Sequence, residues 1–327
     1  MYMANRALEG TLFGSLAAPA GCGPAADACS GPAAANACGF AVAHCNFRLR
    51  GAESDGDEQF VRSWCSSHGV QLFCTAFDTA EYAAAHGISI EMAARELRYG
   101  WFAQICAAHG FDALAVAHNA DDNAETLLLN LLRGTGSRGL RGMAASSESP
   151  AEPASSSSAG CPLRILRPML GISRKEISAW MTARGLEWRE DSSNSSDAYK
   201  RNILRHKVLP AFEEINPSYL GTLARDMRNF AQVDDIAEEY YRAALPLVRD
   251  SKGIRITPLL AHRHWRYLLW RLLEPYSLNA ETFDKLCALL ERYSAEPRGT
   301  VTISGKTFQS STHTLRICRT TLLAQQK

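Results

Sequence analysis

Residues with chemical potential gather in one stretch of this 327-residue sequence, from His118 to Leu140. His118 is followed by the adjacent acids Asp121 and Asp122, and the stretch ends in Arg133-Gly-Thr-Gly-Ser-Arg-Gly-Leu. A pair of carboxylates suits Mg²⁺ held against phosphates. A glycine-rich loop with arginine suits phosphate or nucleic acid, because its backbone N–H groups can approach an anion closely. The stretch therefore predicts a site for a phosphorylated ligand and a metal ion.

The elements around this stretch would hold it at the edge of a sheet. The apolar run from 113 to 117 predicts a buried parallel strand. A helix should follow, with Asp122 as its N-cap, Glu125 completing a capping box and Gly134 ending it. Ligands of open α/β sheets bind where strands end, which is where His118 falls. Capping and turn formation explain these residues singly but not their combination. The apolar face of the helix is predicted from Leu128, Leu131 and Leu132.

The spacing H-x-x-D-D-x-x-E-T-x-L-L-x-L-x-R-G-x-G-x-x-G-L resembles that of the tRNA(Ile)-lysidine synthetase family. This resemblance implies an α/β fold with a parallel-sheet, Rossmann-like PP-loop ATPase domain, a long connecting helix and a small α+β domain. It also implies an ATP- and Mg²⁺-dependent ligase in the cytoplasm. The enzyme would join L-lysine to the wobble cytidine of the AUA-decoding isoleucine tRNA, whose anticodon is CAU, through an adenylated cytidine.

Two motifs before His118 extend the resemblance. The run from 40 to 44 predicts a strand, and the loop after it resembles His-x-Asn-x-x-Leu-Arg, which implies that His44 and Asn46 lie near the nucleotide. The segment from 88 to 109 predicts a helix capped by Ser89. Its motif E-x-x-A-R-x-x-R-Y implies arginines close to the phosphates of ATP or tRNA, although a salt-bridged surface helix is the alternative.

Two further motifs follow the insertion-like segment 144–161, which is rich in Ser, Ala and Pro and predicts a flexible loop. Residues 163–170 predict a strand that ends at Arg167, and Ser173-Arg-Lys-Glu176 predicts a capping box. Residues 190–205 resemble the family pattern D-x-S-N…R-N-x-x-R, which would place a basic helix on a phosphate backbone. An ordinary basic helix is the alternative.

The resemblance assigns candidate roles residue by residue. The catalytic candidates are Asp121, Asp122, Arg95 and Arg133, with Asp121 and Asp122 also the metal ligands. The nucleotide-binding candidates are Asp27, His44, Asn46, His118, Gly134 and Gly136. The tRNA-binding candidates are Arg98, Arg167, Arg201, Asn202 and Arg205.

Residues 16–38 depart from the family pattern, because they are rich in Ala, Gly, Pro and Cys and predict no strand or helix. The family has a phosphate loop S-G-G-x-D-S here. The nearest string, Gly23-Pro-Ala-Ala-Asp-Ala28, keeps only Asp27, and Pro24 removes a backbone donor. Either the phosphate loop has been lost or the stretch comes from an error in the reading frame.

Composition agrees with a globular chain. The hydrophobic share is 46%, and no apolar run approaches the roughly 20 residues that cross a bilayer. Residues 1–20 predict no signal peptide. Ten cysteines lack the close spacing of zinc or redox motifs, which favours reduced thiols of a cytosolic protein. Residues 1–199 have a net charge of −6 and residues 200–327 a net charge of +7, so the basic C-terminal part is compatible with a polyanion.

Domain boundaries follow from these patterns: a PP-loop domain over 1–216, a connector helix over 217–249 and a small tRNA-binding domain over 250–327. Two other functions stay open. One is an impaired homologue that binds tRNA without activating it. The other is a different PP-loop tRNA enzyme, such as a thiolase, although the lack of C-x-x-C pairs counts against it. The oligomeric state, a homodimer included, is not determined by the sequence.

Overall fold

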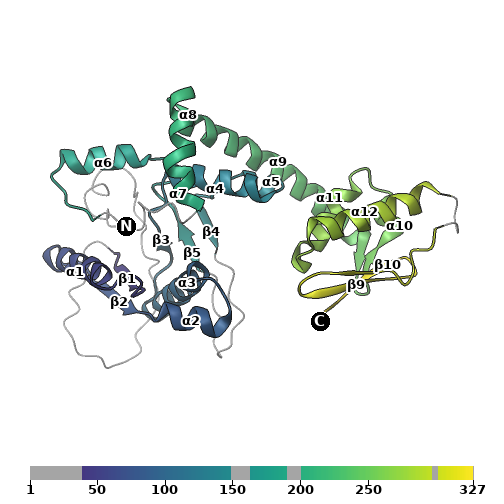
Figure 1. The fold of residues 1–327 in the computed structure, drawn as a ribbon, viewed down its shortest axis with the longest axis horizontal. Helices are drawn as coiled ribbons and strands as arrows, with labels where there is room; N and C mark the ends of the chain where they lie inside the picture. Colours follow the sequence, from purple (N-terminus) through teal and green to yellow (C-terminus); the bar gives the residue numbers. More distant parts are fainter. Residues whose placement is uncertain (1–38, 149–162, 190–199, 297–300, 327) are drawn as a thin grey trace, which may run out of the picture. The chain divides into compact units, whose positions relative to one another are not determined.

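The computed structural model describes residues 39–148, 163–189, 200–296 and 301–326 (Figure 1). Residues 16–38, which depart from the family's phosphate-loop pattern, and the candidate Asp27 lie outside the described residues. The chain divides into two compact units, residues 1–227 and residues 228–327.

The strands of the first unit form two small sheets. One sheet pairs β1 (Val42–Asn46) and β2 (Leu72–Ala76) in parallel. The other has the order β3-β5-β4, in which β3 (Leu114–Ala115) and β5 (Arg164–Leu166) run parallel and β4 (Ser146–Glu148) runs antiparallel at the edge. The parallel pairs confirm the predicted α/β class. The prediction of a flexible loop over 144–161 is wrong at residues 146–148, because their backbone pairs with β5. Residues 149–161 lie outside the described residues.

One helix joins the two sheets of the first unit. Phe102, on α3 (Ile90–His109), forms a buried cluster with Leu163 and Ile165, and Ala43 and Leu114 pack against this cluster. The helix therefore packs against strands of both sheets. The helices here are α1 (Ala52–Ser67), α2 (Thr79–His86), α3 (Ile90–His109), α4 (Ala120–Arg133), α5 (Ser137–Leu140), α6 (Arg174–Ala183), α7 (Lys200–Ile203), the π-helix η2 (Leu204–Val208) and α8 (Leu209–Ile215).

Helix ends follow the capping residues expected from the sequence. Ser89 caps α3 by accepting a hydrogen bond from the Met92 backbone N–H at 3.2 Å, and Gly110 ends the helix in the left-handed conformation. Ser173 and Glu176 form the predicted capping box at the start of α6. These caps satisfy backbone groups that the helix itself leaves unpaired.

The long helix α9 (Tyr219–Val248) contains the boundary between the units. The second unit has a five-stranded antiparallel sheet of order β6-β7-β10-β9-β8, whose Leu315, Ile317 and Leu322 are buried among helix leucines such as Leu268 and Leu286. Among the described residues, no helix combines the length and apolar character needed to cross a bilayer. The elements are β6 (Arg249–Asp250), β7 (Gly253–Arg255), α10 (Ile256–Leu260), α11 (Trp265–Leu273), η3 (Glu274–Tyr276), α12 (Ala280–Ala295), β8 (Thr307–Gln309), β9 (His313–Cys318) and β10 (Thr321–Gln326).

Candidate active site

The start of α4 places two acids in one helical turn. Asn119 is the N-cap: its Oδ1 accepts a hydrogen bond from the Asp122 backbone N–H at 3.0 Å, and Asp122 Oδ2 accepts one from the Asn119 N–H at 3.1 Å. The prediction that Asp122 is the N-cap is wrong, because the helix begins at Ala120. Asp122 is the third residue of the helix and forms the capping box with Asn119. Asp121 and Asp122 therefore lie in the first turn, where the helix dipole favours negative charge.

Arg174 connects these acids to the start of α6. Its backbone N–H donates to Asp121 Oδ2 at 2.8 Å, and its Nη2 lies 3.4 Å from Asp122 Oδ1. Asp121 thus lies in the first turn of α4 and accepts a hydrogen bond from a backbone N–H in the first turn of α6. The two helices begin side by side, and the acids lie where they meet.

Glu125 lies one turn further along α4 and is fully buried, with 0% of its surface exposed. Arg205 holds it with two parallel hydrogen bonds, Nε to Oε1 at 2.9 Å and Nη2 to Oε2 at 3.3 Å, and Arg174 Nη2 lies 3.8 Å from Oε1. Such fork-to-fork pairing is the strongest arrangement that arginine makes with a carboxylate. The prediction that Glu125 completes the capping box is therefore wrong.

Arg205 belongs to the π-helix η2, whose wider turn changes the direction of its side chains relative to α7 and α8. Only 19% of its side chain is exposed, so the pairing with Glu125 occupies a residue expected to contact tRNA at the surface. Its neighbour Arg201 donates from Nη2 to Thr126 Oγ1 on α4 at 3.3 Å. We call Asp121, Asp122, Glu125, Arg174 and Arg205 the arginine–carboxylate cluster.

His118 lies beside this cluster, between the end of β3 and the start of α4. Its Nδ1 accepts a hydrogen bond from Arg167 Nε at 3.3 Å, across the parallel pair of β3 and β5. Burial lowers the pKa of His118 below its usual 6.5; Asp122 opposes this effect, and the positive charges of three arginines add to it. These arginines are Arg167, Arg201 and Arg95.

The helix α3 carries two further candidates, Arg95 and Arg98. The charge of Arg95 acts on His118, and its guanidinium lies 4.9 Å from the ring centre of Tyr99. Arg98 lies over the ring of Phe47, at 5.0 Å from the ring centre. Both cation–π contacts hold the side chains in place while leaving guanidinium hydrogens for an anionic ligand.

The end of β1 is organised by Asn46, which is 4% exposed. Its Nδ2 donates to Asp55 and Glu58 at 3.0 and 3.1 Å, and its Oδ1 accepts from the backbone of Arg48, which has a positive φ of 53°. The amide donors are thus used inside the protein, so the side chain shapes the loop after β1 instead of offering donors to a nucleotide. Burial also lowers the pKa of His44, the other nucleotide candidate of this strand.

Arg133, Gly134 and Gly136 lie at the opposite end of α4 from the acids. The helix has 14 residues, so its two ends are about 20 Å apart at 1.5 Å per residue. The structure therefore does not bring these three residues to Asp121 and His118. The apolar face predicted here is also wrong in part, because Leu131 and Leu132 are 51% and 76% exposed.

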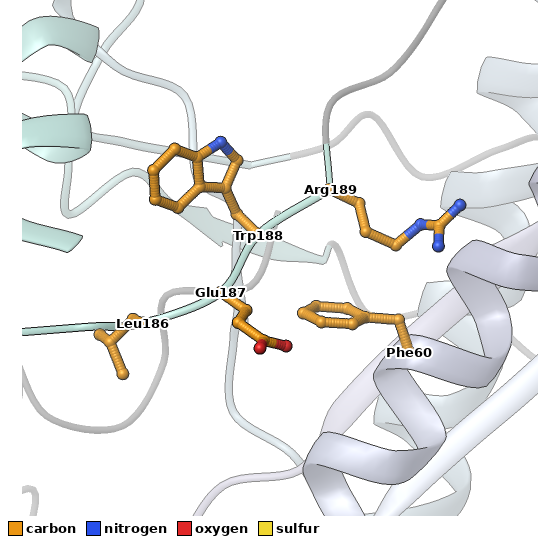
Figure 2. Close-up of a pocket in the computed structure, with 5 residues that line it drawn as sticks. All are labelled: Phe60, Leu186, Glu187, Trp188 and Arg189. Carbon is orange, nitrogen blue, oxygen red and sulfur yellow. The ribbon is translucent and has the colours of Figure 1, made fainter. Parts of the chain in front are cut away.

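A separate pocket of about 460 Å³ lies between α1 and the segment after α6 (Figure 2). Figure 2 shows the Glu187 carboxylate beside the ring of Phe60 and the Trp188 indole pointing away from it. Arg189 donates from Nε to Asp57 at 2.6 Å. None of the predicted site residues lines this pocket.

The donors fit Mg²⁺ as a partial site. Asp121 Oδ1 remains after Oδ2 has accepted the Arg174 backbone N–H, whereas Asp122 Oδ1 lies 3.4 Å from Arg174 Nη2 and a metal ion would have to share it with that guanidinium. Mg²⁺ is commonly held by one or two carboxylates together with substrate phosphates and water. In the part of the chain that the structure describes, no three Asp, Glu, His or Cys side chains form a ready-made metal site.

Sequence reasoning missed two members of the cluster as functional residues. The sequence predicts Glu125 as a cap, although its place one turn after Asp121 and Asp122 on the same helix is also a signal for a shared site. Arg174 lies within the capping box Ser173–Glu176, so the sequence gives no separate signal that it contacts the acids of α4. Neither pairing can be read from local spacing, because the partners lie on different helices.

Comparison with known proteins agrees with this fold. Residues 28–212 match the family model of the PP-loop domain, and residues 249–327 match the TilS substrate binding domain. The chain therefore belongs to the PP-loop family. A solved U34-tRNA thiolase from Methanococcus maripaludis is similar over 58% of this chain and 61% of its own, with a TM-score of 0.44 and 13% identity.

Curated relatives narrow the family further. A tRNA(Ile)-lysidine synthase from Parabacteroides distasonis is 40% identical over 83% of this chain and 57% of its own length. The corresponding protein from Bacteroides thetaiotaomicron is 40% identical over 73% of this chain and 53% of its own. The chain is a member of the tRNA(Ile)-lysidine synthase family, and it spans about half the length of the curated relatives it matches.

Proposed function

We propose that this chain catalyses the ATP-dependent joining of L-lysine to the wobble cytidine of an isoleucine tRNA with a CAU anticodon. The cytidine O2 attacks the α-phosphorus of ATP and pyrophosphate leaves. The lysine ε-amine then attacks C2 of the cytidine and AMP leaves, which gives lysidine. The cytoplasm, where tRNA and ATP are both present, is the proposed location.

The observation that carries this proposal is the arginine–carboxylate cluster beside His118, in a chain that matches both domains of the family. The cluster places cations and carboxylates together where the strands end, the position at which α/β proteins bind nucleotides. A reaction between ATP, a cationic amino acid and a polyanionic RNA needs both signs of charge within one site.

We assign the residues as follows. Arg95 and Arg201 face the phosphates, since guanidinium groups bind phosphate oxygens well. Asp121 and Asp122 hold Mg²⁺, which when bound neutralises phosphate charge. Glu125 and its arginines keep the two helix starts in register. Arg98 and the residues from Arg133 to Gly136 contact tRNA outside the reacting centre, as does the region 250–327.

The proposal is tested with the purified chain, ATP, lysine and a transcript of the isoleucine tRNA. We expect lysidine in the nucleosides of the digested tRNA, detected by mass spectrometry, and its loss in Asp122→Asn. The exposed Lys175→Ala serves as the matched control and should retain activity, because Lys175 is 88% exposed. Modification in the Asp122→Asn variant at the control rate would contradict the assignment.

A second function, tRNA binding without activation, is favoured by one observation: residues 16–38 lack the S-G-G-x-D-S sequence. The same assay separates the two. A chain that binds the tRNA transcript in a filter assay but forms neither adenylated tRNA nor lysidine is the binder. Replacing residues 23–28 by Ser-Gly-Gly-Ala-Asp-Ser would then be expected to restore adenylation.

A further inference from the structure

The contact between His118 and Arg167 determines where the imidazole carries its proton. An arginine side chain is always protonated and can only donate hydrogen bonds. Because Arg167 Nε lies 3.3 Å from His118 Nδ1, Nδ1 must be the acceptor. A neutral ring with an unprotonated Nδ1 carries its hydrogen on Nε2.

Arg167 is itself held in place by several contacts. Its Nη1 donates to the Ala144 backbone oxygen at 2.8 Å and to Ser147 Oγ at 2.9 Å, and its backbone N–H donates to Ala145. These contacts come from the segment that leads into β4 and from β4 itself. These contacts therefore fix the guanidinium while its Nε donates a hydrogen bond to His118.

The surroundings of His118 oppose a second proton. The charged groups that act on the ring are Asp122 from α4, Arg95 from α3, Arg201 from α7 and Arg167 after β5. A proton on Nδ1 would place the N–H donor of the ring against the N–H donor of the cationic Arg167 guanidinium. Burial and the arginines also lower the pKa of the ring. In the described residues, no protein group is hydrogen bonded to Nε2.

We propose that His118 serves the reaction as a neutral hydrogen-bond donor through Nε2–H to an anionic oxygen of the bound nucleotide, and that Arg167 is the positioning residue that fixes this tautomer. The inference rests on the proposed function. It also means that His118 is not the base that deprotonates the lysine amine, because accepting a proton at Nε2 would require Nδ1–H to face Arg167.

The tautomer is tested first, without activity, by NMR of the full chain labelled with ¹⁵N-histidine. The His118→Gln variant identifies the resonances of His118. We expect Nε2 protonated and Nδ1 unprotonated at neutral pH, and loss of this single tautomer in Arg167→Met. A protonated Nδ1 in the wild-type chain, or an unchanged tautomer in Arg167→Met, would overturn the proposal.

The role is tested by a matched pair of amides. His118→Gln can place an amide N–H near the Nε2 position, whereas His118→Asn can keep an acceptor near Nδ1 but loses the distal donor. We expect His118→Asn to weaken ATP binding and lysidine formation by about tenfold to a hundredfold relative to His118→Gln, the usual effect of a hydrogen bond to a charged group. Equal losses in both variants, or no loss in either, would refute the donor role. A wild-type chain that shows the predicted tautomer but forms no lysidine would refute the proposed function alone.

Discussion

The pairing of Glu125 with Arg205 allows a quantitative prediction about stability. Replacing Arg205 by Met removes both hydrogen bonds to a carboxylate that is 0% exposed. Breaking a buried ion pair from one side typically costs about 3–5 kcal/mol, because the remaining charge is buried without its partner. Arg174, at 3.8 Å, offsets part of this cost. We therefore expect a loss of about 3 kcal/mol, at the lower end of that range.

Hydrogen exchange of peptides from α4 measures this loss locally, which matters because a chain of two units need not unfold in one step. A cost of about 3 kcal/mol corresponds to roughly a hundredfold faster exchange, since each 1.4 kcal/mol is about a factor of ten. Lys175→Met is the control. Its ion pair with Glu213 spans 3.5 Å between side chains that are 88% and 55% exposed, so the variant should lose under about 1 kcal/mol.

A double variant completes the test. Glu125→Gln with Arg205→Met removes both charges, so its loss of stability should be smaller than the sum of the two single losses. Exchange in α4 that is equally fast in Arg205→Met and in the Lys175 control would refute the reasoning. It would mean that the Glu125 carboxylate is not held by Arg205 in a buried environment.

Three other predictions follow from the first unit. Burial lowers the pKa of His44 and His118 below 6.5. The unfolded chain therefore binds protons at these rings more readily than the folded chain does. Their contribution to stability is present above about pH 6.5 and is lost as the pH falls through the lowered pKa values. The urea midpoint should therefore fall between about pH 7 and about pH 5, and less steeply in His118→Gln; equal slopes would contradict this. Asn119→Ala should cost about 1 kcal/mol and speed exchange at the start of α4, whereas Asn119→Ser should retain most of the cap; identical exchange in both variants would count against the capping role. Burial raises the pKa of the Cys45 thiol to about 12, so brief alkylation should leave Cys45 unmodified in the folded chain and modify it in urea, as read by peptide mass spectrometry. Equal modification in both states would show that the thiol is accessible.

The sequence by itself determined several helix starts and the family. Ser89 and the capping box at Ser173 begin their helices as predicted, because such a cap depends on residues three positions apart. The strand predicted at 40–44 was found at Val42–Asn46, a shift of two residues. The motif around His118 identified the family because it combines local geometry with unusual residue types.

Only the tertiary structure decided how the charged residues pair. Glu125 and Arg205 are 80 positions apart, and no local pattern indicates that the π-helix directs Arg205 onto the buried carboxylate. The same holds for the contacts of Arg174 with the acids of α4 and of Asn46 with Asp55 and Glu58 of α1. The length of α4 separates Arg133 from the acids, although all belong to one continuous motif. Spacing along the chain encodes hydrogen bonds within one helix or turn, whereas ion pairs between helices depend on how the whole first unit packs.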